Sequence, residues 1–254
     1  MILRALDVET TGLKASEGAA VCQLGWTDLT LVDNEWRIGQ PRWMYVNPKH
    51  HIPANMSGIH DVTDADVKDA PWIYEAMDAA GLFDPKLTAL VAHNARFERQ
   101  FLDPIFEMHR RHIHTLKIEP LPPAPWICTY KNAIKLDTDG VALDYKAQTL
   151  RYQLKLDVDK VLVTPKHTAG PDSFLDALIL QRELTKLTVA EMIEIQKSPV
   201  VLPRFWFGKH KGERTSDIPS SYYRWMNEPG RDFDEDVLET AAFYLAQRAK
   251  EFGA

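Results

Sequence analysis

The chain opens with Ile2-Leu3-Arg4-Ala5-Leu6-Asp7-Val8-Glu9-Thr10-Thr11-Gly12, an apolar run that ends in two carboxylates separated by one residue. Side chains alternate faces along a strand, so Asp7 and Glu9 point to one side while Leu6 and Val8 point into a core. Two carboxylates on one face repel each other unless a cation neutralises them. Mg²⁺ is typically anchored by one or two carboxylates together with substrate phosphates. The run therefore indicates either a metal-binding strand or a strand end with two solvated acids. Further carboxylates later in the sequence are needed to distinguish these two interpretations.

The bulk composition is that of an ordinary globular chain. Its 254 residues suffice for one sizeable core and a small appended module. The formal net charge is −6, so binding to nucleic-acid phosphates has to come from a local patch or a bound metal. No stretch approaches the roughly 18 apolar residues of a membrane span, and Asp7 comes too early for a signal peptide. We expect a cytoplasmic protein that does not bind a membrane.

The two cysteines, Cys22 and Cys128, stand far apart in the sequence. Neither belongs to a CxxC pair, which argues against a structural zinc site and against a disulfide framework. A reducing compartment fits this pattern.

The early segments predict the edge of a sheet. Residues 19–31 and 42–46 have the composition of strands, and Asp33-Asn34 predicts a turn between them. Strands joined by short turns are antiparallel, which favours an antiparallel or mixed sheet over a doubly wound parallel one. Residues 87–93 are typical of a short buried strand, and residues 126–129 predict a last strand.

A helix is expected directly after residues 87–93. Apolar residues recur at three-to-four spacing from Phe97, and Glu98 falls one turn into this helix. Pro104 is unfavourable inside a helix. We therefore expect Asp103 to cap a new helix, with proline at its first position, rather than to bind a ligand.

The second informative stretch is Lys166-His167-Thr168-Ala169-Gly170-Pro171-Asp172, which opens a helical run that reaches Leu187. His167 is expected in the loop before this helix and Asp172 in its first turn. An acid in a first turn is also stabilised by the helix dipole alone. For Asp172 taken by itself we favour that interpretation.

The composition changes after residues 191–203, where we expect a short helix and a linker. From Arg204 to Arg214 aromatic residues alternate with basic ones, including Lys209 and Lys211. This pattern is typical of a surface that stacks nucleobases and meets phosphates. It is equally typical of a small module whose few aromatic residues form its only core. Residues 234–252 predict a final amphipathic helix.

Three of these stretches, taken in order, resemble the DEDDh 3′–5′ exonucleases, a family with a ribonuclease-H-like fold. The match consists of Asp7-Val-Glu9-Thr-Thr-Gly12, His93-Asn94-Ala95-Arg96-Phe97-Glu98, and His167 with Asp172 five positions on. Within the family, the bacterial exonuclease X group is similar in Trp126-Ile-Cys-Thr129, in Phe207-Gly-Lys-His-Lys-Gly212 and in Tyr223-Arg224-Trp225.

The resemblance implies an α/β fold, a ribonuclease-H-like mixed β-sheet flanked by helices. It covers about residues 1–190, which we expect to form the exonuclease domain. Residues 191–203 would then be the short helix and linker. Residues 204–254 would form a small C-terminal aromatic and basic module that can bind nucleic acid.

The resemblance also implies a role for each matched residue. Two divalent cations, Mg²⁺ or Mn²⁺, would lie between the scissile phosphate and the carboxylates of Asp7, Glu9, Glu98 and Asp172. Glu9 would help to activate the attacking water. His167 would take its proton, a role that suits an imidazole because this group exchanges protons near neutral pH. The expected substrate-binding residues are Thr10, Thr11, Gly12, Leu13, Asn94, Lys209, Lys211 and Arg214.

Position 98 departs from the family pattern, because the family usually has aspartate there and this chain has glutamate. The extra methylene moves the carboxylate outward, and misplacement of about 1 Å can lower a rate about a hundredfold. If this position reaches its ion through water, Glu98 can substitute by displacing that water. We expect an active enzyme, with a slow one as the alternative.

The expected function is metal-dependent 3′–5′ hydrolysis that releases nucleoside monophosphates from DNA 3′ ends, either single-stranded or frayed. One alternative is an exoribonuclease of the same family, distinguished by its response to the 2′-hydroxyl. Another is a catalytically weak accessory subunit that binds nucleic acid without metal. A structural metal site, revealed by metal-dependent folding, is the third. The expected partner is DNA, or RNA under the first alternative, and the oligomeric state stays open.

Overall fold

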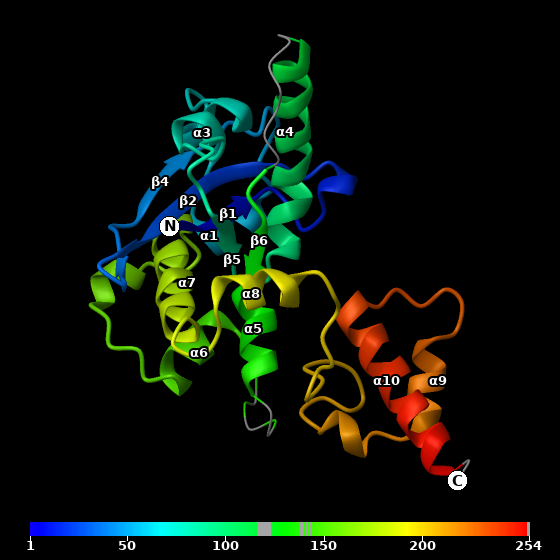
Figure 1. Cartoon of the computed structure of the whole chain (residues 1–254). Coiled ribbons are helices and arrows are strands. Elements are labelled where there is room, and N and C mark those ends of the chain that lie inside the picture. Colours follow the sequence, from blue (N-terminus) through cyan, green and yellow to red (C-terminus); the bar gives the residue numbers. More distant parts are fainter. Residues whose placement is uncertain (116–122, 138–139, 141, 143, 253–254) are drawn as a thin grey trace.

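The computed structural model describes residues 1–115, 123–137, 140, 142 and 144–252. Six strands in this part of the chain form one mixed sheet. They are β1 (Ile2–Thr10), β2 (Val21–Val32), β3 (Glu35–Ile38), β4 (Arg42–Tyr45), β5 (Ala89–Ala92) and β6 (Trp126–Cys128). The order is β3-β2-β1-β5-β6, with β4 also paired to β2 (Figure 1). The central strand β1 is antiparallel to β2 and parallel to β5, so the expected mixed sheet is confirmed.

A tight hairpin starts the antiparallel half of the sheet. Asp33 and Asn34, between β2 and β3, both have positive φ, 52° and 63°. A two-residue type I′ turn requires this conformation, so the turn predicted here is confirmed. The sequence prediction lacks β3, because this short edge strand alternates exposed charges at Glu35 and Arg37 with residues that are only half-buried.

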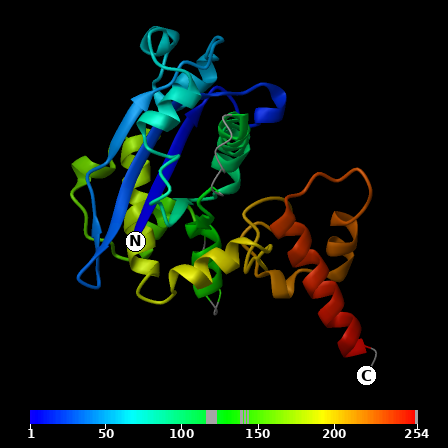
Figure 2. The ribbon, with the colours of Figure 1, turned by 45° about the horizontal axis from the view of Figure 1, so that its top comes forward.

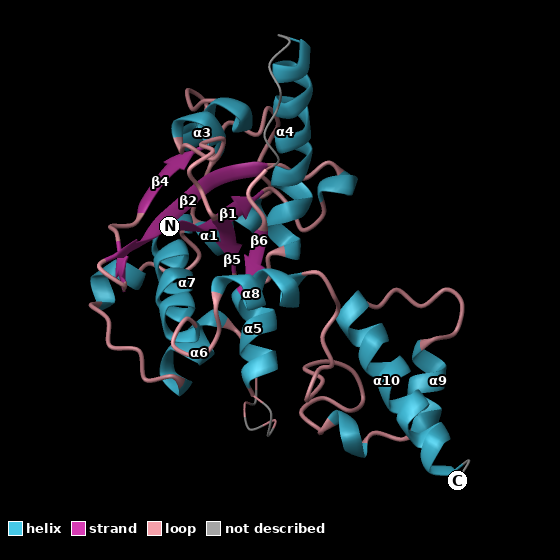
Figure 3. Cartoon of the chain, in the orientation of Figure 1, coloured by secondary structure: helices cyan, strands magenta, loops and turns pink. Residues whose placement is uncertain are grey.

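Helices cover both faces of the sheet (Figures 2 and 3). The helices are α1 (Ala54–His60), α2 (Asp64–Val67), α3 (Ile73–Ala79), α4 (Arg96–Thr115), α5 (Thr129–Leu136), α6 (Ala147–Gln153), α7 (Ala169–Glu183), α8 (Val189–Gln196), α9 (Ser220–Met226) and α10 (Glu235–Phe252). Short 3₁₀ turns occur at Ala15–Glu17, Lys160–Val163 and Thr215–Asp217. None of the helices in the described ranges is long and apolar enough to cross a membrane.

The side chains of β1 alternate between the two helical layers as the sequence predicts. Leu3 and Ala5 are buried in the layer that contains α7, together with Ala177 and Leu180. On the opposite face, Leu6 and Val8 belong to the core formed with α3 and α4. The odd-numbered face of β1 therefore leads from the α7 layer directly to Asp7 and Glu9 at the end of the strand.

The predicted break at Pro104 is wrong, because α4 continues through this residue. Proline lacks the N–H that would bond the preceding turn, which weakens a helix at that point. Phe101, Leu102 and Phe106, which flank Pro104, are all buried. Their packing outweighs the missing hydrogen bond, since most helical stability in proteins comes from such tertiary contacts.

Asp103 therefore caps no new helix. One of its carboxylate oxygens accepts the indole N–H of Trp126 at 3.0 Å, and the other accepts Nε of Arg99 at 2.9 Å. Asp103 thus ties α4 to β6, and the expectation that it is not a ligand agrees with these partners.

The C-terminal segment, residues 204–252, packs beside α5 and α8 (Figures 1 and 2). Its buried aromatic residues Phe205 and Tyr223 belong to an apolar cluster that continues into α5 and α7. Lys131 of α5 is 6% exposed and forms ion pairs with Glu235 and Asp236 of α10, at 3.4 and 3.7 Å. The segment therefore shares its core with the helices of the sheet domain.

Candidate active site

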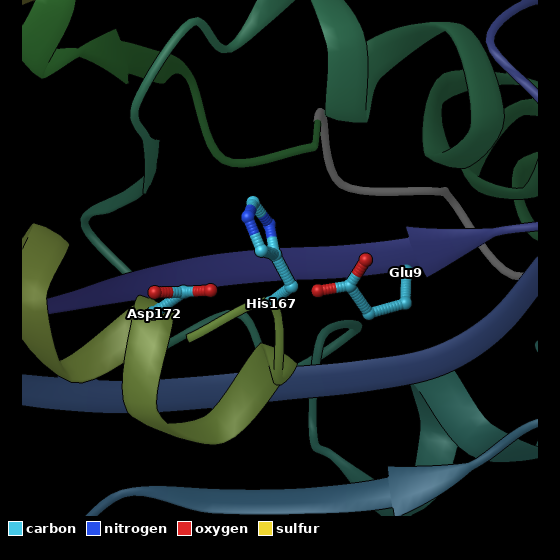
Figure 4. A group of neighbouring side chains, drawn as sticks. All are labelled: Glu9, His167 and Asp172. Carbon is cyan, nitrogen blue, oxygen red and sulfur yellow. The ribbon is translucent and has the colours of Figure 1, made fainter. Parts of the chain in front are cut away.

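Three groups that can bind a cation meet at one end of β1 (Figure 4). Glu9 comes from the strand, His167 from the loop before α7, and Asp172 from the first turn of α7. Their ligand atoms all lie within 4.8 Å of one another, although most of the chain separates Glu9 from the other two. The loop position predicted for His167 and the first-turn position predicted for Asp172 are those observed.

Contacts with β2 hold the start of α7 against the sheet. A Cβ at Gly25 would lie 2.0 Å from the carbonyl oxygen of Ala169, so only glycine permits this close approach. The side chain of Gln23 accepts the N–H of Ala169 at 2.7 Å, and the hydroxyl oxygens of Thr27 and Ser173 are 3.0 Å apart. These contacts fix the position from which α7 presents its acids.

Asp7 and Glu98 reach the same end of the sheet from β1 and α4. Ala5 pairs with Val91 across β1 and β5, and continuing this register places Asp7 level with His93, where β5 leads into α4. Glu98 lies in the first turn of α4 and is 3% exposed. Its Oε2 atom has no hydrogen-bond partner among the described residues.

Burial and mutual repulsion oppose the charged forms of these carboxyl groups. Burial, followed by the charges of Glu9, Asp172 and Glu98, raises the pKa of Asp7 well above its ordinary value. Burial, followed by Asp172, raises the pKa of Glu9 to about 8. Burial also raises the pKa of Asp172 and of Glu98. Such a cluster can carry its full negative charge only beside positive charge.

The donor set fits a hard divalent cation. Carboxylate oxygens are the ligands that Mg²⁺ and Mn²⁺ prefer. The unpartnered Oε2 of Glu98 is a buried acceptor, and native proteins rarely leave such an atom unsatisfied. A cation, or its bound water, would satisfy it. The group formed by Glu9, His167 and Asp172 is therefore suited to hold a divalent cation.

His167 lies at the solvent side of the cluster. Its side chain is exposed, and its backbone has a φ of 57°. Non-glycine residues adopt this left-handed conformation only rarely, and histidine is among those that tolerate it best. The imidazole can therefore reach both a water molecule at the carboxylates and the bulk solvent.

The loop after β1 is held in one conformation by internal hydrogen bonds. The hydroxyl of Thr10 donates to the carbonyl oxygen of Gly12 at 2.7 Å. The N–H of Thr11 donates to the carbonyl oxygen of Ala20 at 2.9 Å. Leu13, directly after this turn, is 73% exposed. The loop thus presents an apolar side chain to solvent beside the carboxylates.

Two residues that the sequence analysis missed also hold this loop. Gln100 of α4 accepts the N–H of Ala15 at 3.0 Å and donates to the carbonyl oxygen of Leu13 at 3.2 Å. His60 of α1 is 4% exposed, and its Nε2 lies 3.3 Å from the carbonyl oxygen of Thr10. Local sequence contains no signal for either contact, because each joins residues that are distant along the chain.

His93 and Asn94 play different parts where β5 leads into α4. The Nδ1 atom of His93 lies 2.8 Å from the hydroxyl oxygen of Thr129, and its Nε2 lies 2.7 Å from the carbonyl oxygen of Tyr145. Burial lowers the pKa of His93 to about 4, so this imidazole stays neutral and supports the turn. Asn94 is exposed with a φ of 67°, and it is available to a substrate.

The predicted nucleic-acid residues of the C-terminal segment lie on its surface. Lys209, Lys211 and Arg214, called the basic turn below, are all exposed. Phe205 is buried in the core of the segment, whereas the neighbouring Trp206 is 42% exposed. Core formation therefore explains part of the aromatic pattern, and Trp206 remains available for stacking.

The sequence analysis also did not identify a buried acid on α7. Asp176 lies one helical turn beyond Asp172 and is 3% exposed. After burial, its charge is among the causes that raise the pKa of Asp7 and of Glu98. Its four-residue spacing from Asp172 is a sequence signal for a shared helix face. That spacing is also what an ordinary core position would show.

Some known proteins are similar to one domain of this chain, and others are similar over almost its full length. The Exonuclease family model, RNase_T, matches residues 5–180. Exodeoxyribonuclease 10 of Escherichia coli strain K12 is 28% identical over 253 residues, covering 96% of this chain and 99% of that protein. The epsilon subunit of DNA polymerase III from Rickettsia felis is 31% identical over 100 residues, 39% of this chain and 41% of that protein.

Solved structures show the same similarity. Exonuclease X in complex with 5′ overhanging duplex DNA has a TM-score of 0.55 and 26% identity, covering 76% of this chain and 98% of that chain. The nuclease domain of 3′hExo, described as a DEDDh family member bound to rAMP, has a TM-score of 0.51 and 16% identity. It covers 72% of this chain and 92% of that chain, and it shares the fold.

Proposed function

The chain belongs to the Exonuclease (RNase_T) family and to its DEDDh type, and we therefore propose that it is a metal-dependent 3′–5′ exonuclease that shortens DNA. The observation that carries the proposal is the meeting of Glu9, His167 and Asp172 within 4.8 Å. Asp7 and Glu98 reach the same end of the sheet from β1 and α4, and the charges of Glu9, Asp172 and Glu98 add to the burial that raises the pKa of Asp7. Such a set of carboxylates with one exposed histidine is suited to phosphodiester hydrolysis.

The chemistry follows from the positions of the residues. Asp7, Glu9, Glu98 and Asp172 would hold two divalent cations, which when bound supply positive charge for the attacking and the leaving oxygen. His167 accepts a proton as water attacks the terminal phosphorus. The bond from phosphorus to the O3′ atom of the preceding nucleotide breaks. The products are a nucleoside 5′-monophosphate and a strand with a free 3′-hydroxyl, and the exposed His167 returns its proton to solvent.

The loop after β1 and the start of α4 are suited to hold the 3′ end. Backbone groups of Thr10, Thr11 and Gly12 would meet the terminal nucleotide, while the exposed Leu13 would pack against its base. The exposed Asn94 would approach the same nucleotide from the other side. An apolar side chain at a strand end favours substrates whose terminal base is unpaired.

DNA is the favoured substrate. The relative that spans nearly the whole of both chains is named an exodeoxyribonuclease, and a similar structure at 26% identity was solved with DNA. These two comparisons support DNA over the exoribonuclease alternative.

We assign residues 1–190 to the exonuclease domain, 191–203 to a short helix and linker, and 204–254 to a C-terminal module. The Lys131 ion pairs with α10 support a fixed placement of the module beside the nuclease domain. The exposed basic turn and Trp206 support a role in binding the strand that leads away from the active site.

The test is digestion of DNA and RNA oligonucleotides of equal sequence, each with a 5′ label, in Mg²⁺, in Mn²⁺ and in chelator. We expect a descending ladder on DNA with metal and none with chelator. A Glu9→Gln variant purified in the same way is the control for contaminating nuclease. A ladder on RNA alone would identify an exoribonuclease. Metal-independent DNA binding without any cleavage would identify an accessory binding subunit.

A further inference from the structure

A β-bulge interrupts the pairing of β1 with β2 directly after Glu9. Glu9 itself pairs with Gln23 in the regular register. The next pair is Thr10 with Val21, so the register passes over Cys22. An extra residue of this kind disrupts the ladder, bends the strand and re-aims the side chains beside it. The bulge therefore lies between the carboxylate of Glu9 and the loop that would meet the 3′ end.

The imidazole of His60, the last residue of α1, contacts both strands at this bulge. Thr10 and His60 are both buried, and Nε2 of His60 lies 3.3 Å from the carbonyl oxygen of Thr10. A buried carbonyl group needs a hydrogen-bond donor, and a bulge takes backbone groups out of the ladder. On the other strand, Sγ of Cys22 lies 3.8 Å from the same Nε2 atom.

The partners of His60 determine which ring nitrogen carries the proton. The Nδ1 atom accepts the backbone N–H of Val62 at 3.1 Å, and a ring nitrogen that accepts carries no proton. In a neutral imidazole the proton then lies on Nε2, which donates to the carbonyl oxygen of Thr10. A proton on Nδ1 would point at the N–H of Val62. The two contacts therefore require the neutral ring with its proton on Nε2.

Further hydrogen bonds hold the segments on both sides of this contact. At the end of α1, the N–H of Asp61 donates to the carbonyl oxygen of Ser57 at 2.8 Å. The hydroxyl of Ser57 donates to the carbonyl oxygen of Val62 at 2.8 Å. In the loop after β1, Thr11 and Ala20 are joined by two bonds, of 2.9 and 3.0 Å. The imidazole thus connects an ordered helix end to an ordered loop.

We propose that His60 is a positioning residue of the exonuclease: its Nε2–H holds the carbonyl group of Thr10 and so fixes the bulge that aims Glu9 and the following loop. The inference rests on the proposed function, because it concerns the geometry of that reaction. His60 acts through the backbone of Thr10 and exchanges no proton with the substrate. Misplacement of a reacting group by about 1 Å can lower a rate about a hundredfold, so a shift of about half that distance costs about tenfold.

Two substitutions at position 60 of the full-length protein separate the two hydrogen bonds. His60→Asn keeps an acceptor near the place of Nδ1, for Val62, and loses the donor to Thr10. His60→Gln keeps a donor near the place of Nε2, for Thr10, and loses the acceptor for Val62. Each variant is the matched control for the other, because each loses one buried hydrogen bond at the same site.

The first measurement is 3′-end shortening of a 5′-labelled single DNA strand in Mg²⁺, together with thermal unfolding. We expect His60→Asn to lower kcat by about tenfold. His60→Gln should recover most of that loss, to within about threefold of wild type. Both variants should melt lower than wild type by a similar amount, about 2–4 °C. A merely structural His60 would lower kcat equally in the two variants.

The second measurement reads the same contact in chelator, without catalysis. In protein labelled with ¹⁵N-histidine, the nuclear magnetic resonance shifts of His60 should be those of a protonated Nε2 and a bare Nδ1. The spectrum of His60→Gln assigns these signals. Hydrogen exchange at the amide of Thr11 should be faster in His60→Asn than in His60→Gln, because the loop has lost its donor.

A proton on Nδ1 of His60 would overturn the inference, and this result is obtained on the wild-type protein, whether or not the variants fold. Equal kcat values for the two variants of an active enzyme would overturn the positioning role and leave the proposed function intact. A wild-type protein that shortens no DNA with Mg²⁺ or Mn²⁺ would refute the proposed function, and the positioning role with it.

Discussion

Gln100 links α4 to the loop that would meet the strand end. Its carboxamide makes one hydrogen bond to Ala15, at 3.0 Å, and one to Leu13, at 3.2 Å, so both sides of the exposed Leu13 are held. Gln100→Leu keeps the size of the side chain and removes both polar atoms. We predict that this variant frees the loop and leaves the carboxylates in place.

The two hydrogen bonds determine the size of the effect. Each contributes about 0.5–1.5 kcal/mol net, so we take about 2 kcal/mol for the pair. A substrate with a paired 3′ end must then order the loop as it binds. Because about 2 kcal/mol corresponds to about 30-fold in affinity, KM should rise about 30-fold with little change in kcat. A single strand has no terminal pair for Leu13 to displace, so its KM should rise about threefold at most.

The assay is the steady-state rate of 3′-end shortening of a blunt duplex and of its matching single strand, both with a 5′ label. Arg111→Leu is the control, since Arg111 lies on the same helix and pairs with Glu107, away from the loop. Gln100→Glu keeps the acceptor for Ala15 but not the donor to Leu13, and should give an intermediate KM. Equal increases in KM on the two substrates, or a loss confined to kcat, would show that Gln100 does not act through the loop.

His167→Ala should lower kcat by about 10²–10⁴ with nearly unchanged Mn²⁺ affinity; a normal single-turnover rate would remove His167 from the mechanism. Glu98→Asp should slow turnover, because the shorter side chain withdraws its carboxylate by about 1 Å; a large gain would show that the native glutamate is a compromise. In chelator, stability should fall as the pH rises from about 5 to about 8. The pKa of Glu9 is about 8 in the folded state against 4.5 for the ordinary group, so the folded state binds more protons. The loss reaches up to about 1.4 kcal/mol per pH unit for this group. Divalent cations should flatten this profile in thermal melts, and a rising profile would contradict the sign. Alanine replacement of the basic turn should weaken DNA binding and reduce the slope of log affinity against log salt by about 2; an unchanged slope would leave these residues as a solvated turn.

Local patterns predicted much of the fold. The alternation along β1 and the Asp33-Asn34 turn could be found in sequence because strand periodicity and turn conformation depend on adjacent residues. The continuity of α4 through Pro104 could not be predicted from the sequence. It depends on burial of Phe101 and Phe106 against other elements, and local propensity yields to such packing.

The acids at strand ends and helix starts could be identified from local patterns: Asp7 and Glu9 share a face of β1, and Asp172 lies in a first turn. Which of them meet could be seen only in the folded chain, where Glu9 and Asp172 come together with His167. Distances between residues far apart in the chain depend on strand register and helix placement, which local patterns do not specify. Here those are fixed by the pairing of β1 with β5 and by the close approach of α7 to Gly25.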